Sequence, residues 1–318
     1  MSRPETAGGS GPQSPPPEAS PAGGVRGTVG PARRLVLLGH PVAHSLSPAM
    51  QGAALRAAGL PWTYELRDVP PGSLAEALAA LRADPAWAGG NLTIPHKEAV
   101  LPLLDEVDPE ARAIGAVNTL VRAGGRVKGY NTDGRGFLRD LAEHGLDPGA
   151  LRGRRALLLG AGGAARAVAF ALAGAGMELV IVNRTPQRAR RLAADLTERF
   201  GPGAAAARDP GDPTLGDLVA GCLLVVNATS AGMPPQAGID PLPPGCRLQP
   251  GQICYDLVYR PAVTPFLARA AAAGARALGG LGMLLHQGAA AFELWTGRPA
   301  PLTVMRAALQ EALARLPH

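Results

Sequence analysis

Cysteine is scarce in this chain of 318 residues, which contains only Cys222, Cys246 and Cys254. No two of them have the CxxC spacing of a metal or redox site, so neither a disulfide scaffold nor a zinc finger is expected. This usage is typical of a reducing compartment, and we expect a cytoplasmic protein. No apolar run is long enough to span a membrane, and the N-terminus lacks the apolar core of a signal peptide.

Lysine and aromatic residues are also rare. Of the 31 lysine and arginine residues, only Lys97 and Lys128 are lysines, and aromatic residues make up 4% of the chain. The net charge of +6 is scattered along the sequence. Without a dense basic block or aromatic side chains to stack on bases, a nucleic-acid partner is not expected. The histidines show no metal-ligand spacing, so no metal is expected.

What the chain does contain is typical of a globular protein. Hydrophobic residues account for 47% and charged residues for 18%, and the length corresponds to two domains of about 150 residues each. Residues 1–31 are an exception, because they are rich in proline, glycine and serine and nearly free of large apolar side chains. Such a segment cannot offset its ordering entropy by burial, so we predict a disordered tail.

Strand and helix patterns alternate after the tail. The first half predicts a mostly parallel sheet. Its expected elements are strands at about 34–39, 63–69, 90–94 and 116–122, and helices at 48–58, at 73–83 with Ser73 as its cap, and after Pro95. A second α/β unit has expected strands at 156–159, 178–182, 223–227 and 253–257, and residues 282–316 are mostly helical.

A glycine-rich loop opens the second unit. Its sequence, Gly160-Ala161-Gly162-Gly163-Ala164-Ala165, matches G-x-G-x-x-G/A with alanine in the third place. The loop follows an apolar strand and precedes a helix, which is the context that dinucleotide binding requires. Gly162 lets the backbone approach a pyrophosphate at the helix start. The sequence therefore predicts a dinucleotide site.

The residues after the next strand indicate which dinucleotide binds. An NAD site usually presents Asp or Glu there to the ribose 2′-hydroxyl. This chain has Asn183-Arg184-Thr185, with Arg188 one helical turn further on. A guanidinium binds a phosphate with a fork of donors, whereas an acid would repel it. We therefore predict NADP as the cofactor.

Polar side chains gather at strand ends in the first half. Ser45 and Ser47 are two residues apart, a spacing that places both hydroxyls on one side of extended backbone and suits a carboxylate. Taken alone, they are equally compatible with a helix cap. Further hydroxyls, amides and charges follow in Asn91-Leu92-Thr93-Ile94-Pro95-His96-Lys97, Asn118-Thr119 and Asn131-Thr132-Asp133-Gly134. This set suits a polyhydroxylated acid as substrate.

These motifs together resemble the shikimate dehydrogenase family, which reduces 3-dehydroshikimate to shikimate with NADPH in the biosynthesis of chorismate and aromatic amino acids. The resemblance runs from Arg33 to the C-terminus. It rests on GHPVAHSLSP, NLTIPHK, GAVNTL, NTDG, GAGGAARA, NRT, NATSAGM, YDLVY and GLGMLLHQGAAAFELWTG, which occur in the order of the family. Agreement of so many ordered motifs by chance is not expected.

The resemblance implies a role for each matching residue. Lys97 and Asp133 form the catalytic pair. Substrate contacts fall to Ser45 and Ser47 at the carboxylate, with Thr93 and Tyr259 assisting, and to Asn91, Asn118 and Gln287 at the ring hydroxyls. The cofactor contacts are Gly160, Ala161, Gly162, Gly163, Ala164 and Ala165 at the pyrophosphate, Asn183, Arg184, Thr185 and Arg188 at the 2′-phosphate, and Thr229, Leu257, Gly280 and Met283 along the nicotinamide and adenosine path.

The expected chemistry is hydride transfer from NADPH to a ring ketone. The Lys97 ammonium would stabilise the developing alkoxide and donate the proton, and the Asp133 carboxylate would position that ammonium. Whether Lys97 is the proton donor or an electrostatic group stays open at this point. The plain alternative is a surface ion pair, which contributes only about 0–1 kcal/mol.

The resulting fold class is a two-domain α/β protein. Residues 32–133 and the returning C-terminal helices of residues 281–318 form the expected substrate-binding domain, and residues 134–280 form the expected Rossmann-type domain, with the site in the cleft between them. The rival functions are an NAD-dependent quinate/shikimate dehydrogenase, a non-catalytic metabolite sensor on this fold, and a folate-linked dehydrogenase of similar architecture. The sequence leaves the oligomeric state open, and a homodimer is one state that it allows.

Overall fold

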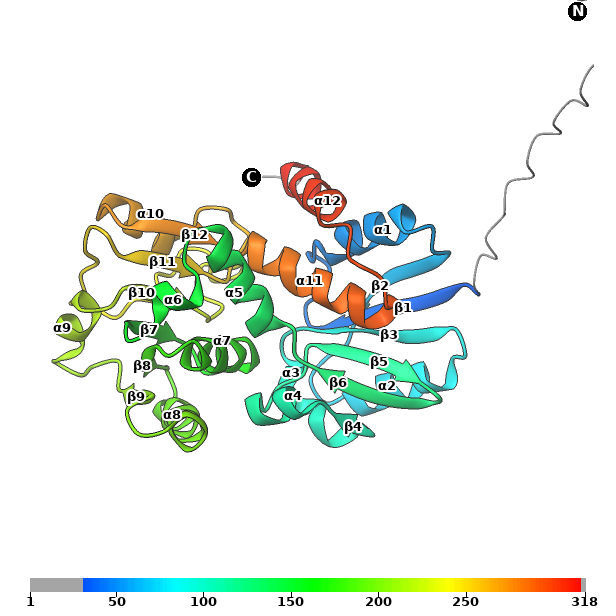
Figure 1. Ribbon diagram of the computed structural model, residues 1–318, viewed down its shortest axis with the longest axis horizontal. Coiled ribbons are helices and arrows are strands. Elements are labelled where there is room, and N and C mark those ends of the chain that lie inside the picture. Colours follow the sequence, from blue (N-terminus) through cyan, green and yellow to red (C-terminus); the bar gives the residue numbers. More distant parts are fainter. Residues whose placement is uncertain (1–30, 316–318) are drawn as a thin grey trace, which may run out of the picture.

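Residues 31–315 are the part of the chain that the computed structural model describes, and they form two sheets joined by helices (Figure 1). The predicted disordered tail, residues 1–31, lies outside the described residues except for its last position. Within residues 31–315, no helix is both long enough and apolar enough to cross a membrane.

The N-terminal sheet has the strand order β2-β1-β3-β5-β6-β4. Its strands are β1 (Arg33–Gly39), β2 (Trp62–Asp68), β3 (Trp87–Leu92), β4 (Glu106–Val107), β5 (Thr119–Ala123) and β6 (Arg126–Tyr130). Parallel pairing joins β1 to β2 and β3, but β5 is antiparallel to both of its neighbours. The prediction of a mostly parallel sheet missed this hairpin. Its turn is Gly124-Gly125, both at positive φ, which is the geometry that joins antiparallel strands.

Short helices connect these strands. They are α1 (Ser47–Ala57), α2 (Leu74–Ala83), α3 (His96–Ala99), the 3-10 turn η1 (Leu101–Leu103) and α4 (Pro109–Ile114). Ser73 stands at the predicted N-cap position of α2. Its side chain makes no capping hydrogen bond, so the predicted capping interaction is wrong. Asp108 does cap α4, because its carboxylate accepts the N–H of Glu110 at 3.0 Å.

The C-terminal sheet is fully parallel, with the order β12-β11-β10-β7-β8-β9. This is the order of a Rossmann fold, and its switch point lies between β7 and β10. The strands are β7 (Arg155–Leu159), β8 (Glu178–Val182), β9 (Ala205–Arg208), β10 (Leu224–Asn227), β11 (Ile253–Asp256) and β12 (Arg276–Gly279). The helices are α5 (Asp133–Glu143), α6 (Pro148–Leu151), α7 (Gly163–Gly174), α8 (Pro186–Phe200), α9 (Leu215–Ala220) and α10 (Pro265–Ala272).

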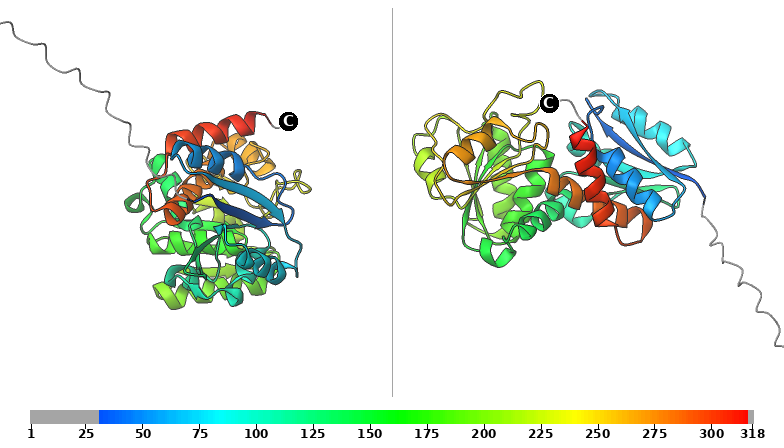
Figure 2. Two further views of the ribbon diagram at one scale, coloured as in Figure 1. Left: turned by 90° about the vertical axis from the view of Figure 1, so that its right-hand side faces the viewer. Right: turned by 90° about the horizontal axis from the view of Figure 1, so that it is seen from above.

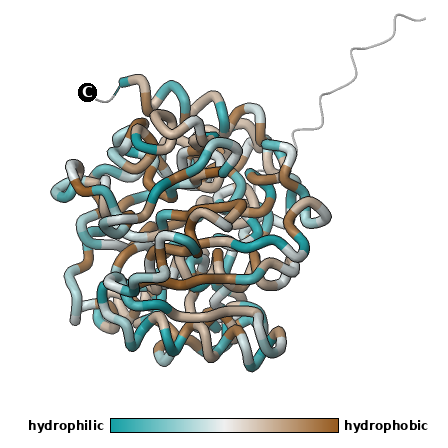
Figure 3. Tube along the Cα trace, turned by 90° about the vertical axis from the view of Figure 1, so that its left-hand side faces the viewer, coloured by the Kyte–Doolittle hydropathy of each residue, from teal (hydrophilic) through white to brown (hydrophobic). Residues whose placement is uncertain are grey.

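Helices cover both faces of this parallel sheet. Along β7, Ala156 and Leu158 point into the core shared with α5 and α7, while Leu157 and Leu159 point into the core on the opposite face. A strand buried on both faces reads as a continuous apolar run, which is why β7 could be predicted from sequence. Figure 3 shows such hydrophobic stretches along the interior strands.

The two C-terminal helices return to the N-terminal half. α11 (Leu281–Thr296) lies between the sheets, and α12 (Leu302–Ala314) lies beside α1 (Figures 1 and 2). Trp295 Nε1 donates to the carbonyl of Leu120 on β5 at 2.9 Å, and the buried Gln51 of α1 donates to the carbonyl of Gly288 at 2.8 Å. The prediction that these helices pack back on the first domain is confirmed.

Candidate active site

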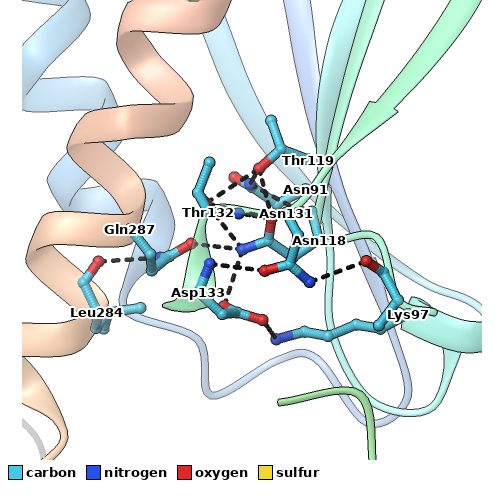
Figure 4. Close-up of polar contacts among 10 residues, drawn as sticks. Asn91, Lys97, Asn118, Thr119, Asn131, Thr132, Asp133, Leu284 and Gln287 are labelled. Carbon is cyan, nitrogen blue, oxygen red and sulfur yellow. Dashed lines mark hydrogen bonds and ion pairs between the residues drawn. The ribbon is translucent and has the colours of Figure 1, made fainter. Parts of the chain in front are cut away.

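The Lys97–Asp133 pair is the centre of the candidate site (Figure 4). Lys97 lies on α3, shortly after β3, and Asp133 is the first residue of α5. Lys97 Nζ lies 2.5 Å from Asp133 Oδ2, and the two side chains are 14% and 4% exposed. The weak ion pairs that contribute about 0–1 kcal/mol are solvent-exposed. This pair is therefore not an ordinary surface ion pair.

Asn118 holds the other oxygen of Asp133. Its Nδ2 donates to Asp133 Oδ1 at 2.8 Å and to the Thr132 hydroxyl at 2.9 Å, and lies 3.3 Å from Gln287 Oε1. Its Oδ1 accepts the backbone N–H of Thr132 at 2.8 Å and the hydroxyl of Thr119 at 2.9 Å. Residues next to β5, at the start of α5 and on α11 thus meet at one buried amide (Figure 4).

Tyr64 is a site residue that sequence analysis missed. From β2 its hydroxyl reaches across β1 and donates to Asn91 Oδ1 at 2.7 Å. Asn91 Nδ2 in turn donates to the carbonyl of Asn118 and to the Thr119 hydroxyl, each at 3.1 Å. Burial raises the pKa of Tyr64, which keeps its hydroxyl a donor. A tyrosine in an alternating strand was the available signal, but its partner follows only from the strand order.

The two serines lie at the start of α1. Ser47 is buried, and its backbone N–H donates to Ser45 Oγ at 3.2 Å. Tyr259, from the loop after β11, packs against the apolar cluster that contains Leu46. Burial raises the pKa of its hydroxyl, and hydrogen bonding with Leu46 and Ser45 opposes that rise. A hydroxyl from the C-terminal half therefore joins the serine loop of the N-terminal half.

Two other predicted residues differ in how they join the site. Gln287 of α11 faces Asn118 with its Oε1, and its Nε2 donates to the carbonyl of Leu284 at 2.9 Å. Thr93 follows β3 directly, but its hydroxyl makes no hydrogen bond to the described residues 31–315. Its methyl group packs over Gly39, where a Cβ would lie 2.2 Å from Thr93 Cγ2.

The glycine-rich loop connects β7 to α7 and fits a pyrophosphate. Gly160 has φ +115°, and a Cβ there would lie 2.8 Å from the carbonyl oxygen of Ala228, so only glycine is tolerated. A Cβ at Gly162 would meet nothing within 4 Å, and as the N-cap residue of α7 this glycine has no side chain that could cap the helix. Since the first N–H groups of a helix have no intrahelical partner, this open space favours an anion.

The same loop touches Lys97. A Cβ on Gly163, the first residue of α7, would lie 2.8 Å from Lys97 Cβ and 3.4 Å from Lys97 Cδ. Any side chain at this position would push α3 away from α7. The loop that fits a pyrophosphate and the aliphatic part of the Lys97 side chain are thus direct neighbours, although they belong to different halves of the chain.

The predicted 2′-phosphate residues follow β8. Asn183 Nδ2 donates to the carbonyl of Thr185 at 2.9 Å, which shapes the turn. Arg184 is exposed and makes no ion pair with the described part of the chain. Arg188, on the first turn of α8, instead binds Glu98 of α3 at 2.6 Å. No carboxylate side chain occupies residues 183–185, where an NAD site would present one.

The remaining predicted cofactor residues line the carboxyl ends of β10, β11 and β12. The backbone N–H and hydroxyl of Thr229 both donate to Asn227 Oδ1, at 3.0 and 2.7 Å. Gly280 is a position of close approach, because a Cβ there would lie 2.2 Å from the carbonyl oxygen of Leu257. Met283 is buried at the start of α11.

A buried carboxyl group ties these loops together. Asp256 Oδ1 accepts from Asn227 Nδ2 and from the N–H of Val258, each at 2.9 Å, and Oδ2 accepts the Thr264 hydroxyl at 2.6 Å. Burial raises the pKa of Asp256 to about 6, against the opposing effect of these donors. The loops after β10 and β11 are thus fixed to the cap of α10, since Thr264 also caps that helix.

Asp256 is expected to make folding stability pH-dependent. Because its folded pKa lies above the ordinary value of 3.8, the folded protein retains a proton that the unfolded chain releases between about pH 4 and 6. Stability should therefore fall by about 3 kcal/mol as the pH rises through this window. Urea unfolding of the native protein and of Asp256→Asn between pH 4 and 7 checks this. An equal slope in both proteins would contradict it.

Asp140, Glu143 and His286 form a second polar cluster, between α5 and α11. One potential ligand atom from each lies within 4.8 Å of the others. Arg306 of α12 already binds both oxygens of Glu143, at 2.8 and 2.9 Å, and the Tyr255 hydroxyl donates to Asp140. These contacts, with His286 Nε2 3.1 Å from Glu143 Oε1, connect α5, α11 and α12.

The fold and the site together define a dinucleotide-dependent oxidoreductase. The family models that match are the shikimate dehydrogenase substrate binding domain over residues 37–120, shikimate / quinate 5-dehydrogenase over 140–202, and the shikimate 5′-dehydrogenase C-terminal domain over 280–310. A shikimate dehydrogenase (NADP(+)) of Moorella thermoacetica is 55% identical over 280 residues, which cover 88% of this chain and 93% of that protein. The chain therefore belongs to the shikimate dehydrogenase family.

Solved structures agree with this assignment. Shikimate 5-dehydrogenase from Thermus thermophilus, in complex with NADP(H) and shikimate, is 44% identical with a TM-score of 0.75, and the match covers 88% of this chain and all 100% of that one. Quinate dehydrogenase from Corynebacterium glutamicum, in complex with NAD, is 34% identical with a TM-score of 0.77, and the match covers 88% and 99%. The fold is shared by both activities.

Proposed function

We propose that this protein catalyses the reversible, NADPH-dependent reduction of 3-dehydroshikimate to shikimate in the biosynthesis of chorismate and the aromatic amino acids. The observation that carries the proposal is the buried Lys97–Asp133 pair, which lies against Gly163 at the start of the dinucleotide-binding helix. Relatives named for shikimate and NADP support the substrate and the cofactor.

The polar network around the pair suits this substrate. Ser45 and Ser47 bind the carboxylate, and Thr93 and Tyr259 assist at that end. Asn91, Asn118 and Gln287 hydrogen-bond the ring hydroxyls. The amides support this division, because the three form one connected hydrogen-bond network around Asp133.

Lys97 acts at the reacting carbonyl. Its ammonium donates a hydrogen bond to the carbonyl oxygen, stabilises the negative charge that develops there, and gives the proton that completes the hydroxyl. Asp133 keeps Nζ in place through Oδ2, while Asn118 anchors Oδ1. In the reverse direction, a neutral Lys97 accepts the hydroxyl proton.

The cofactor-binding half fits NADP. When bound, NADPH supplies the hydride. The open space at Gly162 and the uncapped start of α7 accept the pyrophosphate, and Arg184 and Arg188, with Asn183 and Thr185, bind the 2′-phosphate. Thr229, Leu257, Gly280 and Met283 border the nicotinamide and adenosine path.

The proposed domain boundaries separate the substrate-binding residues from the cofactor-binding residues. Residues 32–133 with 281–318 form the substrate-binding domain, and residues 134–280 form the NADP-binding domain. The separation of the chain into two sheets, one before and one after this boundary, supports it. The returning α11 supplies Gln287 to the substrate side.

An absorbance assay at 340 nm with shikimate or quinate, each combined with NADP or NAD, tests the proposal. Turnover confined to shikimate with NADP is the expected result. Efficient turnover of quinate with NAD would replace it with the activity named for the Corynebacterium relative. Shikimate binding without turnover in any combination would instead indicate a metabolite sensor.

Arg184→Asp is expected to weaken the preference for NADP over NAD. A hydrogen bond between charged groups contributes about 1.5–3 kcal/mol, so NADP affinity should fall at least about tenfold, with repulsion from the new carboxylate adding to the loss. NAD affinity should change little. Dissociation constants for both cofactors check this, and an unchanged NADP/NAD ratio would remove Arg184 from the phosphate site.

Two broader features of the protein belong to the proposal as well. The three cysteines are buried and unpaired, which supports a cytoplasmic location. Burial raises the pKa of Cys222 to about 11 and of Cys254 to about 12, so these thiols stay protonated near neutral pH. A homodimer is one assembly that the sequence allows, and light scattering of the purified protein, whose chain mass is 32.4 kDa, distinguishes it from a monomer.

A further inference from the structure

One arginine on the cofactor side is held by the other half of the molecule. Arg188 Nη2 lies 2.6 Å from Oε1 of Glu98. Arg188 belongs to the first turn of α8, after the strand whose end meets the ribose in a Rossmann fold. Glu98 lies on α3, immediately after Lys97. This ion pair therefore joins the predicted phosphate site directly to the helix that carries the proposed proton donor.

The surroundings of the two phosphate-site arginines differ. Arg184 makes no ion pair with the described residues, so its guanidinium is free for a ligand. Arg188 already has a carboxylate partner, and the side chains of that pair are 51% and 42% exposed. Exposed ion pairs are weak, because water and salt screen them and two long side chains must be held in one geometry. A stronger anion would displace this carboxylate.

A ribose 2′-phosphate is such an anion. It carries more charge than a carboxylate and offers three strong acceptor oxygens to a guanidinium fork. NAD has only an uncharged hydroxyl at the same place, and this group does not compete with the Glu98 carboxylate for Arg188. Glu98 and a 2′-phosphate would therefore share or contest one guanidinium, whereas the hydroxyl of NAD leaves the Arg188–Glu98 contact in place.

We infer that Glu98 competes with the 2′-phosphate for Arg188, and that this competition lowers the preference of the protein for NADP over NAD. The inference rests on the proposed function of Arg188. When the phosphate takes Arg188, the tether between α3 and α8 opens beside Lys97. Glu98 is thus a specificity-determining residue that touches no part of the cofactor through its own side chain.

Glu98→Gln removes the competing charge and keeps the shape of the side chain. We expect it to tighten the binding of NADP and of the fragment 2′,5′-ADP by about two- to fivefold, the range of exposed ion pairs. The binding of NAD and of 5′-AMP should stay unchanged. Calorimetric titration measures all four ligands without depending on turnover, and the two fragments isolate the phosphate from the nicotinamide.

Asp209→Asn is the matched control. Asp209 pairs at 3.0 Å with Arg190, which lies on α8 as Arg188 does. This pair is similarly exposed, but it does not connect α8 to α3. The change removes one negative charge, as Glu98→Gln does. If Asp209→Asn tightens NADP binding by the same factor as Glu98→Gln, net charge explains both effects and the inference is wrong.

A double-mutant cycle with Arg188→Ala separates the inference from the proposed function. We expect Arg188→Ala to weaken NADP binding, and Glu98→Gln to have little effect in that background. A neutral Arg188→Ala would overturn the proposed phosphate role itself. A second outcome is that Arg188→Ala weakens NADP binding as expected while Glu98→Gln has no effect, or has the same effect with and without Arg188. Either result would overturn only the competition between Glu98 and the phosphate.

Discussion

Replacing Lys97 with alanine is expected to lower kcat by a factor of about 10² to 10⁴, because the variant loses both the proton donor and the charge that stabilises the developing alkoxide. The cofactor site should survive. Alanine keeps the Cβ that packs against Gly163, so α3 and α7 can remain in contact. Steady-state kinetics with shikimate and NADP measure the loss, and NADP titration confirms that binding persists.

The sequence supplies a matched control for this variant. Lys128 is the only other lysine, and it lies on β6 with its Nζ 5.2 Å from the ring centroid of Tyr130. Lys128→Ala should leave kcat nearly unchanged. A near-normal kcat in Lys97→Ala would refute the assignment of Lys97 as proton donor and oxyanion stabiliser, whereas equal losses in both variants would indicate a general effect of removing lysine.

Local sequence patterns were sufficient to predict the glycine-rich turn and four strands of the cofactor half, whereas β9 and β12 were missed. The turn at Gly160 and the apolar strand β7 follow from residues that are neighbours in the chain, so a pattern of a few residues specifies them. The antiparallel direction of β5 was missed, although its signal is local as well. The Gly124-Gly125 turn is a local signal for a hairpin, whereas the alternation of strands and helices along the chain favours parallel pairing.

The substrate half depends on contacts that local patterns do not contain. Lys97 and Asp133 are 36 residues apart, and Asn118 and Gln287 are 169 apart. Their grouping was predicted from the resemblance to a family and not from spacing. Where neither source applied, prediction failed. Tyr64 needed the β2-β1-β3 strand order to reach Asn91.

The role of Asp133 depends on both of its oxygens, and this gives the second large expected effect. Oδ2 accepts from Lys97 Nζ, and Oδ1 accepts from Asn118 Nδ2. In Asp133→Asn, one oxygen becomes an NH₂ group, which must face one of these two donors. The variant can therefore orient Lys97 or Asn118, but not both. We expect kcat to fall by about 10² and the KM for shikimate to rise.

The comparison with Lys97→Ala tests whether Asp133 acts through the lysine. Once Lys97 is absent, Asp133→Asn should cost little further kcat, because residues that act as a unit are strongly non-additive. Asp105→Asn is the control for folding. The Asp105 carboxylate lies outside the site and also accepts from two donors, Arg82 and the N–H of Val127. If the losses of the two site variants multiply in the double mutant, Asp133 acts independently of Lys97, and the positioning mechanism is wrong.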